Sequence, residues 1–422
     1  MKNSAVRDPF KNLQYYRFCA YGFLKNLRFF DAFLILIFRE AGLSYLQIGS
    51  LYSIREVFKN IFEIPSGIVA DTFGRKKAML FSFGAYIFSF ALFYLGRSYV
   101  VFALSMIVFG LAEAFRSGTH KAMILKYLEL NNWTSLKTQF YGRTRSWSQL
   151  GSALSSLLAV GIIFLTHQYR ALFLISAIPY VLDFINLASY PDELDAAQLQ
   201  RKEGFWLRLK RNLKDYFTQF ASVPHVRAFF SAASFGGFFK TLKDYLQPVL
   251  QTLVLQMPVF FALSEKQRTA ILIGASYFVL YLLTSYSARN AFKLEARFKN
   301  LALAIDAAYL VGVLSVIFSG LSLMLKMGLL AALLYAGLYL IRNIRRPLIV
   351  SYLSELLPSN IMASGLSTAS QLETLVVVVA SPILGACVDF FGLGAGIAML
   401  GSLFLLLFVF VRVSNSSIIK NI

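Results

Sequence analysis

Charged residues are scarce in this sequence. Only 15% of its 422 residues are Asp, Glu, Lys or Arg, whereas hydrophobic residues make up 57% and the mean hydropathy is +0.62. A soluble domain carries about 25% charged residues, so a soluble globule of this composition is excluded. A disordered chain is excluded as well, because aromatic residues reach 16%. The composition therefore predicts a polytopic membrane protein.

The sequence also has few residues of the kinds that form cross-links or hold metals. Its two cysteines, Cys19 and Cys387, lie in apolar runs, so neither a disulfide framework nor a thiolate metal site is expected. The three histidines are scattered and form no HExxH pair, which disfavours a metalloenzyme. A P-loop motif that would bind ATP is missing. We expect no cofactor and no metal, and an enzyme is the least favoured class.

Long apolar runs, by contrast, are abundant. A membrane-spanning helix needs about 20 apolar residues, whereas barrel strands are shorter and alternate in polarity. The runs here are continuous, which favours an all-α polytopic fold. The first run is not a cleaved signal peptide, because Lys25, Arg28 and Asp31 interrupt it. We predict twelve spans, at residues 18–38, 45–66, 78–96, 99–119, 147–166, 170–190, 229–250, 268–287, 300–320, 324–344, 366–387 and 393–413.

Acidic residues are few: 21 Asp and Glu stand against 41 Lys and Arg, a net charge of +20. Such an excess can indicate nucleic-acid binding, but most of the basic residues lie in connections on the same side as the N-terminus. Basic loops stay in the cytoplasm, so both termini are predicted to be cytoplasmic and the charge reflects topology rather than a nucleic-acid partner. The opposite connections hold six basic residues: Arg39, Arg97, Arg170, Lys266, Arg268 and Lys326.

The two halves of the chain repeat one another. Residues 21–30 read YGFLKNLRFF and residues 236–245 read GGFFKTLKDY, so Gly, Phe, Lys and Leu recur at an offset of 215. The tripeptide SQL at 148–150 recurs at 370–372, and Arg116 falls opposite Arg342. Two six-helix bundles related by duplication are typical of secondary transporters. We predict an N-terminal bundle over 1–190 and a C-terminal bundle over 226–422.

Residues 191–225 are predicted to be a cytoplasmic linker between the bundles. The linker opens with the acidic stretch PDELDAAQ and then turns basic. Its apolar residues recur at helical spacing with basic residues between them, a pattern typical of a helix on an anionic lipid surface. A connector without a regulatory role is the simpler interpretation. The apolar residues are Trp206, Leu209, Leu213, Phe217 and Phe220.

One motif makes the prediction more specific. Residues 67–77, between spans 2 and 3, read GIVADTFGRKK, which resembles the signature of the major facilitator superfamily, a family of secondary transporters. The resemblance implies that Gly67 permits close helix approach and that Asp71 faces the N-terminal end of span 11. Together with Gly74, Arg75 would complete a cytoplasmic latch between the halves.

The physics agrees with this implication, because an anion is stabilised at a helix N-terminus and a breakable latch gives two states. Thr72 stands where the family usually has a basic residue. The matching loop of the second half, 288–299, lacks the motif, so the latch is expected to be one-sided.

Ionisable residues at membrane depth are the candidate site, because each is costly there unless paired or hydrated. Eight basic residues in spans 1, 2, 4 and 7 face five acidic ones, and this surplus favours an anionic ligand. In the superfamily's fold, spans 1, 4, 7 and 10 line the central cavity. The predicted substrate-binding residues are Lys25, Arg28, Arg116, Lys240, Lys243, Gln149 and Gln371. The predicted proton-coupling carboxylates are Asp31, Glu113 and Asp244.

A structural role for these charges is equally open. Asp31 lies three residues from Arg28, and Asp244 lies four from Lys240, as ion pairs on one helix face do. The repeat would bring Arg28 and Lys243 to opposite sides of one central site. In span 2 the charged residues are predicted to pair with one another: Arg55, Glu56, Lys59 and Glu63.

These observations favour a secondary active transporter that works by alternating access, coupled to protons and specific for a small anionic or amphipathic solute. Two alternatives stay open: a transporter that expels lipophilic compounds, and a non-transporting membrane receptor of the same fold. The short loops suit a monomer in a bacterial cytoplasmic membrane, with the lipid bilayer as its surroundings. The direction of transport does not follow from a sequence, because alternating access is reversible.

Overall fold

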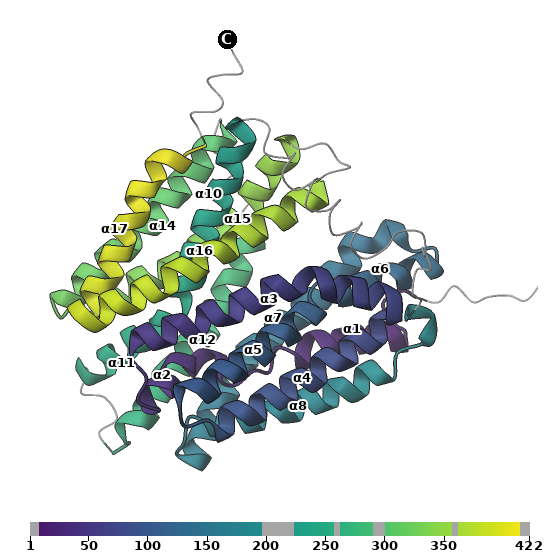
Figure 1. The fold of residues 1–422 in the computed structure, drawn as a ribbon, viewed down its shortest axis with the longest axis horizontal. Helices are drawn as coiled ribbons and strands as arrows, with labels where there is room; N and C mark the ends of the chain where they lie inside the picture. Colours follow the sequence, from purple (N-terminus) through teal and green to yellow (C-terminus); the bar gives the residue numbers. More distant parts are fainter. Residues whose placement is uncertain (1–7, 196–222, 257–261, 290–299, 357–361, 414–422) are drawn as a thin grey trace, which may run out of the picture. The chain divides into compact units, whose positions relative to one another are not determined.

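The computed structural model describes residues 8–195, 223–256, 262–289, 300–356 and 362–413, and every regular element in these ranges is a helix (Figure 1). Four are short 3-10 helices: η1 Asp31–Phe33, η2 Thr134–Leu136, η3 Asp192–Leu194 and η4 Lys243–Tyr245. The α-helices are α1 Leu13–Leu24, α2 Leu34–Glu40, α3 Tyr45–Phe73, α4 Arg75–Leu95, α5 Tyr99–Arg116, α6 Thr119–Leu130, α7 Lys137–Thr166, α8 Ala171–Ala188, α10 Val223–Leu242, α11 Leu246–Gln256, α12 Glu265–Arg289, α14 Leu301–Met324, α15 Gly328–Leu356, α16 Met362–Phe391 and α17 Leu393–Val411.

Contacts divide the chain into two compact units. Unit 1 holds residues 8–31 and 58–195, and unit 2 holds residues 32–57 together with the described residues from 223 onward. Helix α3 therefore contributes its first part to unit 2 and its second part to unit 1. Most of the predicted linker lies outside the described residues, so its amphipathic helix and the proposed bundle boundaries stay predictions.

In unit 1, α4 packs against α5 and α8, and α1 packs against α7 and α8. The interface between α4 and α8 is aromatic. The ring centroid of Tyr180 lies 4.8 Å from that of Phe90, 5.1 Å from that of Phe83 and 5.2 Å from that of Tyr86. Aromatic pairs at such distances stabilise packing beyond the area that they bury. This cluster fixes α8 and holds the Tyr180 side chain in place.

In unit 2, α14 packs against α15 and α17, and α10 packs against α16. Small residues allow the tightest approach. A Cβ at Gly320 would lie 2.5 Å from the carbonyl oxygen of Gly394, so a larger residue would push α14 and α17 apart. Helices within a bilayer rely on such close packing, because lipid is as apolar as their side chains.

Eight helical segments among the described residues are long and apolar enough to cross a membrane, and they match predicted spans 3–6, 8, 9, 11 and 12. The other four predicted spans are charged or interrupted. Spans 2 and 10 fall on α3 and α15, which are continuous but carry several ionisable residues. Spans 1 and 7 were expected to be continuous helices, and this expectation is wrong.

Span 1 is interrupted between Leu24, where α1 ends, and Asp31, where η1 begins. The freed backbone groups bind side chains instead. The Asn26 amide donates to the carbonyl of Gly22 at 2.6 Å, and the Tyr180 hydroxyl donates to the carbonyl of Lys25 at 2.9 Å. Within a membrane, non-helical backbone persists only where such partners or a cavity satisfy it.

Span 7 is interrupted at the corresponding place of the repeat, where η4 separates α10 from α11. Here too tyrosines supply the missing donors. The hydroxyl of Tyr335 donates to the carbonyl of Leu242 at 2.6 Å, and that of Tyr339 donates to the carbonyl of Lys243. Interrupted helices at matching positions of two repeats are the strongest structural pointer to a transporter's binding region.

Candidate functional site

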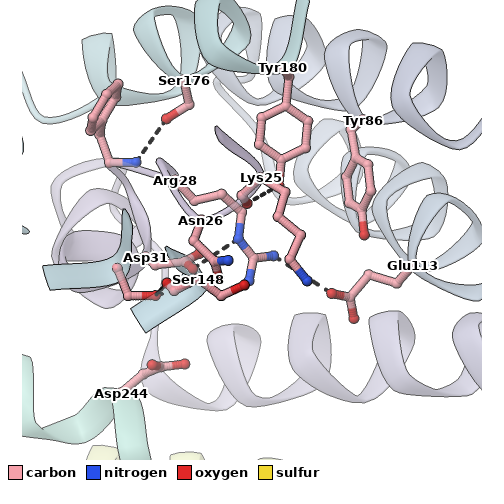
Figure 2. Close-up of polar contacts among 12 residues, drawn as sticks. Lys25, Asn26, Arg28, Asp31, Tyr86, Glu113, Ser148, Ser176, Tyr180 and Asp244 are labelled. Atoms are coloured by element: carbon pink, nitrogen blue, oxygen red, sulfur yellow. Dashed lines mark hydrogen bonds and ion pairs between the residues drawn. The ribbon is translucent and has the colours of Figure 1, made fainter. Parts of the chain in front are cut away.

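Unit 1 gathers three cations around one carboxylate. Glu113 lies on α5, and only 14% of its side chain is exposed. Its Oε1 lies 3.6 Å from Arg28 Nη1 (Figure 2). The same oxygen lies 3.7 Å from Arg116 Nη2, and Oε2 lies 3.8 Å from Lys59 Nζ. These distances are those of ion pairs rather than of tight hydrogen bonds. The carboxylate of Glu113 therefore interacts with all three cations rather than forming one tight pair.

The two arginines of this cluster have further partners. Arg28 Nε lies 3.0 Å from Asp31 Oδ2, and Arg116 Nε donates to the hydroxyl of Tyr86 at 3.1 Å. The structure thus contains the pair of Arg28 with Asp31 that the sequence spacing indicated, and a second pair at the same spacing, Arg116 with Glu113. Because each guanidinium has five donors, both arginines can hold a structural partner and still offer donors to a ligand.

The charges of span 2 form contacts both within the span and beyond it. Arg55 Nη2 lies 2.9 Å from Glu56 Oε1, which fits the expected pairing within the span. Lys59 also reaches Glu113 on α5, a contact that sequence analysis did not indicate. Its ammonium adds to the positive charge around Glu113.

A pocket of about 230 Å³ lies in unit 1 and is lined mainly by α1, α6 and α7. Lys25 and Arg145 are its basic residues, and none of the residues that line it is acidic. Two predicted substrate-binding residues, Lys25 and Gln149, thus line one pocket. Its other polar and aromatic lining residues include Asn26, Tyr21, His120, Tyr141, Thr144 and Ser148.

One wall of this pocket is preorganised. The rings of Tyr21 and His120 stack with centroids 3.5 Å apart and an angle of 14° between them. His120 Nε2 lies 3.2 Å from the Tyr190 hydroxyl, and Lys25 Nζ lies 5.1 Å from the Tyr21 ring centroid. Both rings are buried, so they form a fixed wall with the Lys25 ammonium beside it.

Lys25 connects the pocket with the Glu113 cluster electrostatically. Its ammonium is repelled by Arg116 and Arg28 and attracted by Asp183 and Glu113. Asp183, on α8, is fully buried. Its Oδ1 accepts a hydrogen bond from Asn186 at 3.0 Å, whereas its Oδ2 has no hydrogen-bond partner among the described residues. Among the contacts that the structure describes, Asp31, Glu113 and Asp183 face the cations of this region. The cations of the cluster and the pocket are Lys25, Arg28, Lys59, Arg116 and Arg145. The region keeps a positive surplus.

The candidate residues of unit 2 are paired differently from the expectation. Lys243 Nζ lies 2.8 Å from its neighbour Asp244, and Lys240 Nζ lies 3.2 Å from Glu373 on α16. Lys240 therefore has Glu373 rather than Asp244 as its carboxylate partner. Gln371, two residues from Glu373 on α16, is half-buried. Arg28 and Lys243 belong to different units, so their convergence on one site stays a prediction.

The residues predicted to form the latch meet a segment that sequence analysis did not connect with them. Asp71 Oδ1 lies 3.5 Å from Arg75 Nη2, and a Cβ at Gly67 would meet nothing within 4 Å among the described residues. Gly74 has φ +112°, and a Cβ there would lie 2.4 Å from the Asp195 carboxylate. The end of span 2 is thus covered by the acidic start of the linker.

That acidic start caps α4. Asp195 Oδ1 accepts a hydrogen bond from the backbone N–H of Lys76 at 2.6 Å, and the Lys76 ammonium donates to Asp192 at 2.8 Å. The Lys76 hydrogen bond and charge hold the pKa of Asp192 below its ordinary value. The contact of Asp71 with span 11 stays a prediction, because it would join the two units and residues 357–361 lie outside the described structure.

Comparison with known families decides the classification. The family model described as Major Facilitator Superfamily matches residues 18–381. The chain belongs to the major facilitator superfamily. This multi-pass fold accounts for the helices of both units, and membership makes the protein one of a family of membrane transporters.

Similar proteins and structures support this classification. The chain is 26% identical over 376 residues to the uncharacterized MFS-type transporter YxaM of Bacillus subtilis (strain 168), covering 87% of this chain and 86% of that protein. Crystal structures of the nucleoside transporter NupG and of a D-xylose-proton symporter are similar in fold. The NupG structure has a TM-score of 0.74 and 12% identity, and the match covers 95% of this chain and 98% of that one. The symporter structure has a TM-score of 0.71 and 16% identity, and the match covers 94% of this chain and 97% of that one.

Four ionisable residues of this superfamily member were missed by sequence reasoning. The signal was present for three of them, because the rule that charges at membrane depth are candidates applies equally to spans 6, 9 and 11, whereas Arg345 lies one residue beyond the predicted span 10. Within the described residues, no group of three His, Cys, Asp or Glu side chains is placed to hold a metal ion. The missed residues are Asp183, Asp306, Arg345 and Glu373.

Proposed function

We propose that this superfamily member is a secondary active transporter of a small organic anion, coupled to protons and working by alternating access. The observation that carries the proposal is the pocket of about 230 Å³ in unit 1, which two cations line and no acidic residue enters. Lys25 is half-buried and Arg145 is exposed, and the pocket lining provides no carboxylate to balance either charge. A ligand carboxylate or phosphate would balance both.

The shape of the pocket suggests more about the ligand. Arg145 offers paired donors that match a carboxylate or phosphate, while Lys25 offers a point charge near the Tyr21 ring. Gln149 and Ser148 add polar groups that both donate and accept. The proposed substrate therefore carries one anionic group and further polar groups that these side chains can bind.

Structures of similar fold support a small polar solute. They include a nucleoside transporter, a D-xylose-proton symporter and a POT family transporter in complex with 5-aminolevulinic acid. The POT family structure has a TM-score of 0.72 and 15% identity, and the match covers 94% of this chain and 95% of that one. At such identities the likeness concerns the fold alone, so these solutes are examples of what proteins of this fold bind and do not identify the substrate of this chain.

The Glu113 cluster supplies a coupling mechanism. Glu113 shares Arg28, Arg116 and Lys59, and those cations keep its carboxylate ionised as long as they face it. A substrate anion beside Lys25 in the pocket also attracts Arg116 and Arg28, which lie near enough to repel Lys25. If either arginine moves toward the anion, the Glu113 carboxylate is left with less compensation, and its protonation then becomes favourable. Binding of the substrate in this way promotes protonation of Glu113, so both bind in the same step of the transport cycle. Asp31 stands in the same relation to Arg28 but is more exposed.

The proposal extends to the energy source, the oligomeric state and the membrane in which the protein acts. A proton gradient supplies the energy, without a cofactor, and the transporter acts as a monomer. The relative in Bacillus subtilis supports a bacterial cytoplasmic membrane. Basic inner loops support cytoplasmic termini.

The test combines binding and flux. Purified protein is screened by thermal shift against small carboxylates and phosphates, because a ligand of the native state raises its apparent stability. Any ligand found is then offered to proteoliposomes with and without an imposed pH gradient. Lys25→Gln and Arg145→Gln should each weaken binding at least about tenfold, or about 1.4 kcal/mol.

Arg143→Gln is the matched control, since this exposed arginine lies on the same helix as Arg145 but does not line the pocket. Equal loss in the control and the pocket variants would contradict the assigned site. Binding without flux would favour a receptor of the same fold. A lipophilic cation as the best ligand would favour efflux of such compounds and overturn the anion proposal.

A further inference from the structure

The superfamily motif at the end of span 2 has a second copy elsewhere in the chain. Residues 67–74 read GIVADTFG, and residues 385–392 read GACVDFFG, with the two glycines, the aspartate and the phenylalanine in the same register. Each copy ends a long helix, α3 in the first case and α16 in the second. Each closes on a glycine with positive φ, +112° at Gly74 and +84° at Gly392.

In the structure the second copy is engaged with another helix of unit 2. The carboxylate of Asp389 accepts hydrogen bonds from the first two backbone N–H groups of α3, that of Tyr45 at 2.9 Å and that of Leu46 at 2.7 Å. These N–H groups have no partner inside their own helix, and the helix dipole places positive charge there. Asp389 thus caps α3 from α16.

Glycines allow the two helices to meet at backbone distance. A Cβ at Gly385 would lie 2.2 Å from the carbonyl oxygen of Tyr45, and a Cβ at Gly49 would lie 2.2 Å from that of Ser381. One turn further along α3, the hydroxyl of Ser53 donates to the carbonyl of Val378 at 2.7 Å. The contact therefore runs along both helices.

This contact reaches the interruption of span 7. The ring of Tyr45 stacks on that of Tyr245 with centroids 5.8 Å apart. Tyr245 belongs to η4, beside the ion pair of Lys243 and Asp244. A movement of Lys243 would therefore reach the start of α3 through the stacked rings of Tyr245 and Tyr45.

We propose that Asp389 is a positioning residue for transport, forming with Gly385 a second latch that clamps the start of α3 to the end of α16. The two copies of the motif end spans 2 and 11, and α3 and α16 run antiparallel where Tyr45, Gly49 and Ser53 meet Gly385, Ser381 and Val378. Asp389 closes the outer side, Asp71 closes the inner side, and alternating access requires each to release in turn. The proposal concerns the gate and needs no assumption about the substrate.

The energetics suit a gate. Asp389 is exposed, and a solvated capping carboxylate makes a modest contribution that water can replace when the helices part. The glycines, by contrast, bring the backbones together only in the closed arrangement, which gives two discrete states rather than a continuum.

The test uses a buried reporter between the two helices. Ser53 is 9% exposed in the closed arrangement, so Ser53→Cys is placed in a background with Cys19→Ser and Cys387→Ser. The rate of labelling by a membrane-impermeant maleimide is measured in intact cells and in inside-out vesicles. Asp389→Asn, which removes the charge, should raise the labelling rate from the outside at least about threefold.

The matched control is the first copy of the motif. Asp71→Asn should lower the outside labelling rate, because weakening the inner latch favours the state in which the outer one is closed. Asp389→Glu, which keeps the charge, should label closer to the parent than Asp389→Asn does. Labelling of unfolded protein in detergent normalises each variant for expression.

Three results would overturn the proposal: an unchanged rate in Asp389→Asn, a change of the same sign in Asp389→Asn and Asp71→Asn, or equal rates in Asp389→Asn and Asp389→Glu. Faster labelling of Asp389→Asn that occurs only in inside-out vesicles would overturn the assigned outer side. Because no ligand is needed, a failure of the anion proposal leaves these outcomes unaffected.

Discussion

At the scale of single residues, Glu113 and Lys25 show how an interior charge acquires a role. Glu113 faces three cations and is nearly enclosed, whereas Lys25 lines a pocket that no acidic residue enters. An ion pair that is already satisfied suits the coupling of protons, and a cation that is not balanced within its pocket suits substrate binding. The two residues therefore have different predicted phenotypes.

Replacing Glu113 by Gln removes the negative charge that Arg28, Arg116 and Lys59 share. We expect transport by Glu113→Gln to lose most of its dependence on an imposed pH gradient, because the carboxylate that the three cations share can no longer exchange a proton. Counterflow without a gradient should persist, since the cations stay available to the anion. Proteoliposome uptake at two gradient strengths measures both.

Asp31→Asn is the comparison for this prediction, because Asp31 pairs with the same arginine but is more exposed. It should keep most of the gradient dependence. If both variants transport with the parent's response to the pH gradient, neither carboxylate is the coupling site.

At the scale of secondary structure elements, the interruptions of spans 1 and 7 are held open by side chains from neighbouring helices. Ser176 Oγ accepts a hydrogen bond from the backbone N–H of Phe29 at 3.0 Å, and Tyr180 donates to the carbonyl of Lys25. Helix α8 thus positions both Lys25 and the segment that carries Arg28. A support helix that contacts no ligand can in this way affect substrate binding.

Tyr180→Phe tests this support. The variant leaves a buried carbonyl without its donor, which costs about 1–3 kcal/mol of folding stability. We expect a lower apparent melting temperature in detergent and weaker ligand binding, because Lys25 is no longer held by its backbone. Tyr16→Phe is the control, since Tyr16 is 54% exposed. An equal melting temperature for Tyr180→Phe and the control would contradict the assigned role.

At the scale of the whole molecule, topology rests on the distribution of charge along the sequence. The exposed turn that holds Ser135 follows a basic segment and is predicted to face the cytoplasm, whereas the turn that holds Ser98 is predicted to face outward. Alternating access in the superfamily requires each latch to lie on its own side, so this assignment underlies the gating proposal as well.

Single cysteines at these two serines test the topology. In a background with Cys19→Ser and Cys387→Ser, Ser98→Cys should react with an impermeant maleimide in intact cells. Ser135→Cys should react only after permeabilisation. The reverse pattern would place both termini outside.

Much of the fold followed from local sequence. The span boundaries predicted at 78–96, 170–190 and 393–413 lie within three residues of α4 at Arg75–Leu95, α8 at Ala171–Ala188 and α17 at Leu393–Val411. A bilayer makes this possible, because an apolar run of about 20 residues has no stable alternative to a helix there. Membership in the superfamily followed equally from one short motif and the apolar spans.

By itself the sequence determined the helical class, the family and the residue types that a site can use, because each depends on neighbours along the chain. Tertiary structure decided which charges meet. Glu113 reaches Lys59 on another helix, Lys240 reaches Glu373, and Asp389 caps a helix 343 residues away. It also decided where the helices break, since Tyr180 lies 155 residues from the carbonyl that it binds. An ion pair or a capped carbonyl depends on distance in space, which a single sequence does not specify.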